Sequence, residues 1–324
     1  MATLRTRPAV CVVLALLGSS GPGSAEDWPT KPVRMMVPYA AGGNTDIVAR
    51  LIAQRLAGAF GPQFVVENRA GAAGALAAEA VARAPADGHT LFVATLPQIA
   101  IAPAMTKTPY DPVKDFAPIS NIGTNPFVLV VHPSVPAATV GELVDYARAH
   151  PNKLTYAASG VGSVSYLSIV LFLKLAALDM VPVMYKGGTA PQADVIAGHV
   201  QVYITSLSGV AQYGASSALR LLAVTGPTRA PQIPHVPTFV ESGYEGLNIL
   251  NWTGLMAPAR TPKEVVDRIA KAVALAVRDA KTAEMLEANG VQPLGNSPEE
   301  FTAEIAADIA LWADAVKLTG ISEK

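Results

Sequence analysis

Along most of the chain, short apolar runs alternate with longer stretches in which apolar residues recur every three or four positions. The short runs predict buried strands, and the periodic stretches predict helices. In the first third the predicted elements are a strand at 33–37, a helix from about 47 to 56, a strand at 64–67, a helix at 75–84 and a strand at 90–95. This order is typical of a parallel sheet with helices on both faces.

A second series of elements begins at the apolar run 127–131. The elements predicted after it are helices at 141–149, 166–175 and 190–197 and strands at 154–158, 181–185, 200–205 and 221–225. The last third changes character and predicts two long amphipathic helices. Each follows a sequence that resembles a capped helix start, Thr261-Pro262-Lys263-Glu264 in one case and Ser297-Pro298-Glu299-Glu300 in the other.

The two series predict an α/β protein with two lobes, each a mostly parallel sheet flanked by helices. We expect a discontinuous first lobe made of residues 26–127 and 226–324, and a second lobe made of residues 128–225. The apolar strands near 127–131 and 221–225 are expected to join the lobes as a hinge. The cleft of such a clamshell is the natural place for a ligand.

The first 25 residues have the pattern of a secretory signal peptide. Arg5 and Arg7 precede an apolar run at 9–17, and Gly23-Ser24-Ala25 offers small residues for cleavage. A membrane anchor is the alternative, but the run has about half of the ~20 residues that a spanning helix needs. We therefore expect an exported, periplasmic protein. Its single cysteine, Cys11, would leave with the signal peptide.

Composition and charge exclude several classes of protein. With 51% hydrophobic and 15% charged residues the chain is not intrinsically disordered. A formal net charge of −1 and the lack of a basic stretch interleaved with aromatics argue against nucleic-acid binding. No Cys-x-x-Cys or His-Glu-x-x-His spacing occurs, so we expect neither a metal nor a cofactor.

Catalytic motifs are also missing from the sequence. There is no Gly-x-Ser-x-Gly nucleophile turn, and the five histidines are scattered near turns and strand ends. We therefore expect a binding protein and not an enzyme. A secreted hydrolase whose triad comes from distant segments stays an alternative.

Each predicted lobe contains one glycine loop between a strand and a helix, at 38–46 and at 158–163. Glycine lets the backbone turn with its N–H groups outward, and the helix that follows adds unpaired N–H groups and a partial positive charge. Such loops bind anions without a basic side chain. Because neither loop contains Lys or Arg, the pattern favours a carboxylate over a phosphate. The alternative is that the loops are only turns.

Two residues, Asp46 and Tyr39, allow a choice of roles, and a third is assigned to the core. Asp46, early in the first predicted helix, either favours the helix dipole or pairs with a ligand ammonium or a water. Tyr39 either stacks on the ligand or packs, and its phenol favours a place facing the cleft. Trp252 is expected in the core.

Several segments, taken in order, are distinctive. They are Trp28-Pro29-Thr30-Lys31-Pro32-Val33-Arg34, Gly42-Gly43-Asn44-Thr45-Asp46, Val65-Val66-Glu67-Asn68-Arg69-Ala70-Gly71, Asp87-Gly88-His89-Thr90-Leu91, Pro109-Tyr110-Asp111-Pro112-Val113-Lys114-Asp115-Phe116, Val183-Met184-Tyr185-Lys186-Gly187 and Val236-Pro237-Thr238, with Trp312 and Lys317 near the end. Together they resemble the Bug-type substrate-binding proteins of tripartite tricarboxylate transporters. The resemblance covers essentially the whole chain after the signal peptide.

This resemblance implies a two-lobed, type II-like periplasmic binding protein fold that holds a small carboxylate between its lobes through main-chain groups and ordered waters. The ligand classes implied are di- or tricarboxylates, acidic amino acids and aromatic acids. The positions implied to bind or line the site are Tyr39, Ala40, Ala41, Gly42, Gly43, Asn44, Thr45, Asp46, Thr95, Leu96, Ser159, Gly160, Val161, Gly162, Ser163, Lys186, Gly187, Gly188, Thr189 and Ala190.

The implied partners are a small organic acid and either membrane permease subunits or a sensor ectodomain that uses the same site, and we expect a monomer. Two features depart from the family pattern. Ala40 and Ala41 stand where the first loop usually has prolines, and Tyr166 stands where the second loop usually leads into a histidine. These departures lie beside the expected site and leave the identity of the ligand open.

Overall fold

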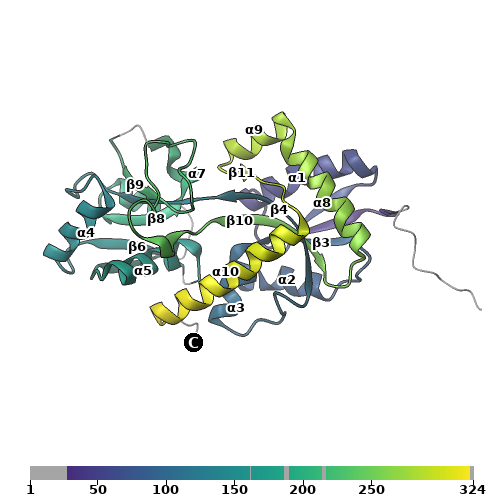
Figure 1. Ribbon diagram of the computed structural model, residues 1–324, viewed down its shortest axis with the longest axis horizontal. Coiled ribbons are helices and arrows are strands. Elements are labelled where there is room, and N and C mark those ends of the chain that lie inside the picture. Colours follow the sequence, from purple (N-terminus) through teal and green to yellow (C-terminus); the bar gives the residue numbers. More distant parts are fainter. Residues whose placement is uncertain (1–27, 161, 186–189, 214–216, 322–324) are drawn as a thin grey trace, which may run out of the picture.

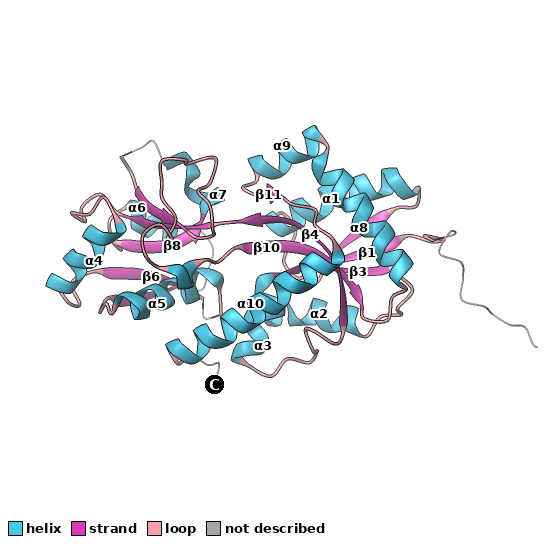
Figure 2. Ribbon diagram, in the orientation of Figure 1, coloured by secondary structure: helices cyan, strands magenta, loops and turns pink. Residues whose placement is uncertain are grey.

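The computed structural model describes residues 28–160, 162–185, 190–213 and 217–321, which form two α/β lobes lying side by side (Figure 1). The predicted signal peptide, 1–25, lies outside the described residues. Each lobe is built on one sheet with helices packed against it (Figure 2). None of the described helices is both long and apolar enough to cross a bilayer. The predicted two-lobed α/β architecture is confirmed.

The sheet of the first lobe has six strands in the order β11-β4-β10-β3-β1-β2. Their bounds are β1 (Val33–Val37), β2 (Phe64–Asn68), β3 (Thr90–Thr95), β4 (Phe116–Asn125), β10 (Asn251–Pro258) and β11 (Gln292–Pro293). β1 pairs in parallel with β2 and β3, whereas β10 runs antiparallel to β3 and β4. β11 also pairs antiparallel with β4.

The sheet of the second lobe has five strands in the order β7-β6-β8-β5-β9. Their bounds are β5 (Phe127–Val131), β6 (Thr155–Ser159), β7 (Val181–Tyr185), β8 (Val202–Ser206) and β9 (Arg220–Val224). β6 is parallel to β7 and β8, but β5 is antiparallel to β8 and β9. Both sheets are therefore mixed, and the prediction of mostly parallel sheets is wrong in this respect. The antiparallel strands β4, β5 and β10 lie next to the crossings between the lobes, outside the strand–helix–strand units that make the parallel part.

Helices cover both faces of each sheet. They are α1 (Asn44–Phe60), α2 (Ala75–Ala82), α3 (Ala102–Met105), α4 (Val140–Ala149), α5 (Val164–Ala176), α6 (Ala190–Ile196), α7 (Leu207–Val210), α8 (Lys263–Arg278), α9 (Ala280–Ala288) and α10 (Pro298–Thr319). The alternating direction of the side chains along β1 shows which residues enter the core on each face of the first sheet. Val33, Met35 and Val37 enter the core that α1 and α8 cover, whereas Met36 enters the core that contains α2.

The long helix α10 spans from the first lobe toward α5 of the second (Figure 1). Its Trp312 is fully buried in a core cluster that also contains Leu167 of α5. The predicted helix start is confirmed, since Ser297 and Glu300 form a complete capping box. The observed start of α8 differs from the predicted one, because Pro262 and not Thr261 is the N-cap, and the side chain of Thr261 makes no capping hydrogen bond.

The chain passes from the first sheet to the second at Pro126, between β4 and β5. The two apolar runs that the sequence assigned to the hinge are β5 and β9, and they pair with each other inside the second sheet. We therefore expect the hinge at the ends of these runs and not within them. This follows from their composition, since runs apolar throughout fit a buried sheet interior better than a solvated crossing.

The segment after β9 stays with the second lobe. Val224 donates its N–H to the carbonyl of Pro237 at 2.9 Å, and Phe239 donates back to the carbonyl of Val224 at 2.9 Å. Ile233 and Val236 are buried in a cluster with residues of β5. The chain re-enters the first sheet only at β10, and the contacts of Ile233, Val236 and Phe239 are with the second lobe, although the predicted first lobe included them. The other lobe boundaries stay a prediction.

Candidate ligand-binding site

The first glycine loop leaves the carboxyl end of β1 and leads into α1. Gly42 has φ +86°, a conformation that favours glycine, and Gly43 is the N-cap of α1 in an extended conformation. No described residue accepts a hydrogen bond from the backbone N–H groups of Gly43, Asn44, Thr45 or Asp46. Ala41, Gly42 and Gly43 are exposed. The loop therefore presents free N–H groups at the positive end of a 17-residue helix.

The buried side chain of Asp46 stabilises this loop through hydrogen bonds. Its carboxylate accepts hydrogen bonds from the Gly42 N–H at 2.9 Å, from Arg50 Nε at 3.0 Å and from Asn68 Nδ2 at 2.9 Å. Asn68 Nδ2 also donates to the carbonyl of Tyr39 at 3.0 Å. Asp46 is only 3% exposed. The side-chain oxygens of Asp46 are thus occupied within the loop, so only its backbone N–H is left for a ligand, and the predicted contact stays a prediction.

The same contacts fix the charge of Asp46. Burial by itself would raise the pKa of this carboxyl group, but the hydrogen bonds from Arg50, Gly42 and Asn68 together hold the pKa below its ordinary value. The carboxylate is thus ionised and paired with Arg50. An anion at the N–H groups of the loop would not meet an unpaired negative charge.

Tyr39 and Thr95 form a closed ring of hydrogen bonds with Gln98, which lies in the π-helical turn Pro97–Ile101 and is fully buried. Thr95 Oγ1 donates to Gln98 Oε1 at 2.6 Å, and Gln98 Nε2 donates to the Tyr39 hydroxyl at 3.0 Å. The third contact, Tyr39 hydroxyl to Thr95 Oγ1, is 3.1 Å, and here Tyr39 donates because the Thr95 proton is already used. The ring fixes the first loop to the end of β3.

The Gln98 side chain is oriented by a fourth contact. Its Nε2 donates to the carbonyl of Ala73 at 3.0 Å, and a carbonyl can only accept, so Oε1 must face Thr95. Gly74 approaches this amide so closely that a Cβ there would lie 2.6 Å from Gln98 Nε2. Leu96, which the resemblance placed at the cleft, has a fully buried side chain in the core. That side chain is therefore not available to a ligand.

The second glycine loop leaves β6 and leads into α5. Ser163 caps α5 by accepting from the Tyr166 N–H at 3.1 Å, and its hydroxyl donates to the carbonyl of Ser159. Gly160 and Gly162 have φ +73° and +83°. Ser159 is buried and its hydroxyl accepts from Tyr203. Val161 lies outside the described residues.

The two loops belong to opposite lobes, and both face the region where the lobes meet. A Cβ placed on Gly162 would lie 3.4 Å from Sδ of Met105 in α3. α3 continues directly from the turn that carries Gln98, which in turn holds Tyr39 of the first loop. Of the remaining predicted positions, Lys186 to Thr189 lie outside the described residues and Ala190 is the exposed first residue of α6.

Three residues that organise the first loop were missed at the sequence level, namely Arg50, Asn68 and Gln98. Asn68 lies in a segment that carries the family resemblance, so its place in that motif was the one available signal. Arg50 stands one helical turn after Asp46, a spacing that favours an ion pair. Nothing in the local pattern distinguished Gln98, because its role depends on a three-residue contact across two loops.

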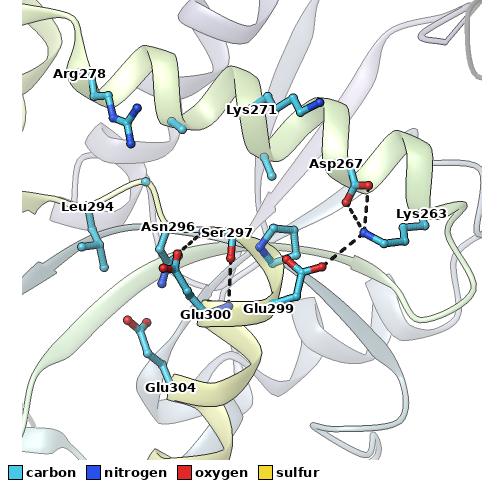
Figure 3. Close-up of a pocket in the computed structure, with 14 residues that line it drawn as sticks. Lys263, Asp267, Lys271, Arg278, Leu294, Asn296, Ser297, Glu299, Glu300 and Glu304 are labelled. Atoms are coloured by element: carbon cyan, nitrogen blue, oxygen red, sulfur yellow. Dashed lines mark hydrogen bonds and ion pairs between the residues drawn. The ribbon is translucent and has the colours of Figure 1, made fainter.

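A separate groove of about 740 Å³ lies between α8 and the start of α10 (Figure 3). Among its charged residues, Lys263 forms ion pairs with Asp267 at 2.8 Å and with Glu299 at 3.4 Å. The start of α10 is already satisfied by Glu300, which accepts from the Ser297 N–H at 2.8 Å. An anion here would meet the acidic side chains of Asp267, Glu299, Glu300 and Glu304 beside the basic Lys263, Lys271 and Arg278, so the free N–H groups of the glycine loops are the better candidate site.

Two α/β lobes, each with a glycine loop that leads from a strand into a helix N-terminus, are typical of a bilobal solute-binding protein. Comparison with known proteins agrees with this class. The model of the tripartite tricarboxylate transporter family receptor matches residues 48–321. The chain therefore belongs to this family of transport receptors, whose members are binding proteins and not enzymes.

Three solved structures are among those most similar to the chain. R. palustris Rpa4515 with adipate is 36% identical, with a TM-score of 0.78 over 91% of this chain and 99% of that one. The periplasmic binding protein BugD is 32% identical, with a TM-score of 0.75 over 92% and 100%. MatC from Rhodopseudomonas palustris with bound malate is 32% identical, with a TM-score of 0.74 over 89% and 100%. The resemblance to Bug-type periplasmic binding proteins is confirmed.

Proposed function

We propose that this protein captures a small carboxylate between its lobes and delivers it to the membrane subunits of a tripartite tricarboxylate-type transporter. The observation that carries the proposal is the row of N–H groups from Gly43 to Asp46, for which no described residue is an acceptor. An oxyanion is the ligand that such a row of donors at a helix N-terminus binds best.

The first loop also explains the choice of carboxylate. Its basic neighbour, Arg50, is held by Asp46 at 3.0 Å, so no free cation of the loop is left for a dianionic phosphate. Charge-assisted hydrogen bonds from several N–H groups suit the two oxygens of one carboxylate. The relatives Rpa4515 and MatC hold adipate and malate, which are both dicarboxylates.

The second loop supports a ligand with two acidic groups. No described residue accepts from the N–H groups of Gly162, Val164 or Ser165, at the start of the 13-residue helix α5. The two lobes thus offer one helix N-terminus each. A di- or tricarboxylate can engage both at once, and so can an acidic amino acid through its two carboxylates, whereas an aromatic acid with one carboxylate would place a different group at one of them.

Cellular placement follows from the same proposal. The pattern of residues 1–25 directs the chain to the periplasm, where a monomer would collect the acid and present it to a permease. The family of transport receptors favours this partner over a sensor ectodomain.

A thermal-shift screen tests the proposal. The mature chain is unfolded and refolded to remove carried ligand, then melted with adipate, malate and other di- and tricarboxylates, each paired with its uncharged amide. A ligand at one hundred times its Kd should stabilise the protein by about 2.7 kcal/mol. We expect an acid to raise the Tm and its amide to leave it unchanged. A chain that no acid stabilises, or that amides stabilise equally, contradicts the proposal.

A further inference from the structure

We propose that the turn Asn289–Gly290, which follows α9, is a further part of the ligand site. It positions the first glycine loop and closes against Ser208 of the other lobe. The inference rests on the proposed function, because it assigns a role to the turn in that site. It concerns residues that neither the sequence pattern nor the resemblance singled out.

The turn is bonded to the first loop through Asn44, the first residue of α1. Asn44 Nδ2 donates to the carbonyl of Asn289 at 2.6 Å, across 245 positions of sequence. Asn289 is itself fixed, because its Nδ2 donates to the carbonyl of Met285 at 2.7 Å. Asn44 stands among the four residues whose N–H groups are free. A shift of the turn would therefore move the N–H groups that bind the ligand.

The other side of the turn meets the second lobe at Ser208 in α7. A Cβ on Gly290 would lie 2.2 Å from Ser208 Cβ and 2.9 Å from Ser208 Cα. Gly290 also has φ +73°, so glycine is required here for two separate reasons. The lobes can approach this closely only because Gly290 has no side chain.

From Ser208 a line of hydrogen bonds runs to the hinge. Ser208 Oγ contacts Ser206 Oγ at 2.9 Å, and Asn125 Nδ2 donates to Ser206 Oγ at 3.3 Å. Asn251 Nδ2 donates to Asn125 Oδ1 at 2.8 Å. Asn125 ends β4 and Asn251 begins β10, the strands that flank the two passages between the lobes.

α7 is held from its other side as well. Gln192 Nε2 donates to the carbonyl of Gly209 at 2.9 Å, and Gln192 lies in α6. α6 begins at Ala190, directly after the segment 186–189 that the resemblance assigned to the ligand. The contact between Gly290 and Ser208 thus joins the ligand-binding parts of both lobes. Opening of the cleft would have to break this contact, whereas the bond from Asn44 stays within the first lobe.

The test compares Gly290→Ala with Gly243→Ala, which serves as the matched control. Gly243 has φ +88° and no atom within 4 Å of an added Cβ, so it carries the same backbone strain without a collision. Spin labels at Asp145→Cys in α4 and Glu264→Cys in α8 report the distance between the lobes. The mature chain has no other cysteine, because Cys11 lies in the predicted signal peptide.

In ligand-free protein, pulsed electron paramagnetic resonance should show longer distances between the lobes for Gly290→Ala, and an unchanged distribution for Gly243→Ala. Ser208→Gly in the Gly290→Ala background should restore part of the short-distance population. If Gly290→Ala does not fold, Ser208→Val replaces it in the test, because the larger side chain at the exposed position 208 would collide with Gly290 in the same way. Equal distributions in all folded variants would overturn the inference.

Affinity provides the second readout. The acid found in the thermal-shift screen should bind Gly290→Ala at least about 10-fold more weakly than wild type, and Gly243→Ala within about twofold. If no acid binds even the wild type, the proposed function fails while the distance measurement still tests the contact. If the wild type binds an acid and the distances do not change, the function stands and the inference fails.

Discussion

The carboxylate of Asp46 accepts the backbone N–H of Gly42 at 2.9 Å, across the loop that joins β1 to α1. This bond holds the buried acid within the loop, and the N–H groups of the following residues have no acceptor among the described residues. The loop therefore has a carboxylate on one side of its backbone and, on the other, the N–H groups that we propose to bind an anion. Arg50 neutralises the internal carboxylate, so the two do not oppose each other.

Replacing Asp46 by Ala should both destabilise the protein and weaken ligand binding. Asn68, Arg50 and the Gly42 N–H would lose their acceptor, at a cost of about 1–3 kcal/mol in the free energy of unfolding. Affinity should fall about 10-fold as the loop loses its support. Chemical denaturation and calorimetric titration measure both. Asp145→Ala, at an exposed position of α4, is the control and should change neither.

The effect of Asp46→Ala should depend on pH. Because the folded-state pKa of Asp46 lies below its ordinary value, its stabilising contribution is present above about pH 4 and is lost as the pH falls. The difference in unfolding free energy between wild type and variant should therefore shrink below pH 4. A difference that stays constant down to pH 2 would show that the charge of Asp46 does not contribute.

Replacing Gly43 by Val should block the site and leave the fold intact. Gly43 has a negative φ, and the nearest atom to an added Cβ is the carbonyl oxygen of Ala40 at 3.7 Å. The side chain would project beside the free N–H groups, so we expect affinity to fall by about 100-fold, or about 2.7 kcal/mol. Gly141→Val, in the first turn of α4, has similar free space and should bind normally. Equal affinities for the two variants would mean that the first loop is only a turn.

Replacing Gly74 by Ala should disturb the ring of Tyr39, Thr95 and Gln98. The added Cβ would lie 2.6 Å from Gln98 Nε2 and 2.8 Å from Pro38 Cβ, at φ +93°. We expect a loss of about 2–4 kcal/mol in unfolding free energy from strain and overpacking together. Gly61→Ala has φ +89° and free space, so its smaller loss measures the backbone strain alone. Similar losses at both positions would rule out a collision with Gln98.

The contribution of Asp308 to the free energy of unfolding should change with pH in the opposite direction to that of Asp46. Burial raises the pKa of this carboxyl group to about 6, although Trp252 Nε1 donates to it at 2.8 Å. Since the folded-state pKa lies above the ordinary value, the native state binds the proton more tightly and this contribution to stability is lost as pH rises from about 4 to 6. In Asp308→Asn the free energy of unfolding should no longer fall with this titration, which amounts to up to about 3 kcal/mol between pH 4 and pH 6. Unfolding curves at pH 4, 5, 6 and 7 measure it, and parallel profiles for the two proteins would contradict the prediction.

Much of the fold could be predicted from the sequence, because each strand–helix–strand unit of the parallel part has a recognisable local sequence pattern. Alternation and glycine loops marked β1, α1, β3 and α5 to within a few residues. β4 and β10 were not predicted. β4 contains Pro118 and Gly123, and its pairing with β10 is interrupted by two register shifts, which hide the period of two. Their place in the sheet is set by long-range pairing.

The site was predictable only in part for a similar reason. The free N–H groups follow from glycine and a helix start, both of which are local features. The inward orientation of Asp46 depends on Asn68, 22 positions away, and could not be read from a window around the loop. The same holds for Gln98, which meets Tyr39 across 59 positions, and for Gly290, which meets Ser208 across the lobes.

The most direct test of the central claim follows the backbone amides of the first loop by nuclear magnetic resonance during titration with the acid that stabilises the protein. We predict that the amide protons of Gly43, Asn44 and Thr45 shift downfield and that the shifts saturate at the concentration given by calorimetry. Binding that leaves these amides unchanged, with the shifts confined to the groove between α8 and α10, would contradict the claim.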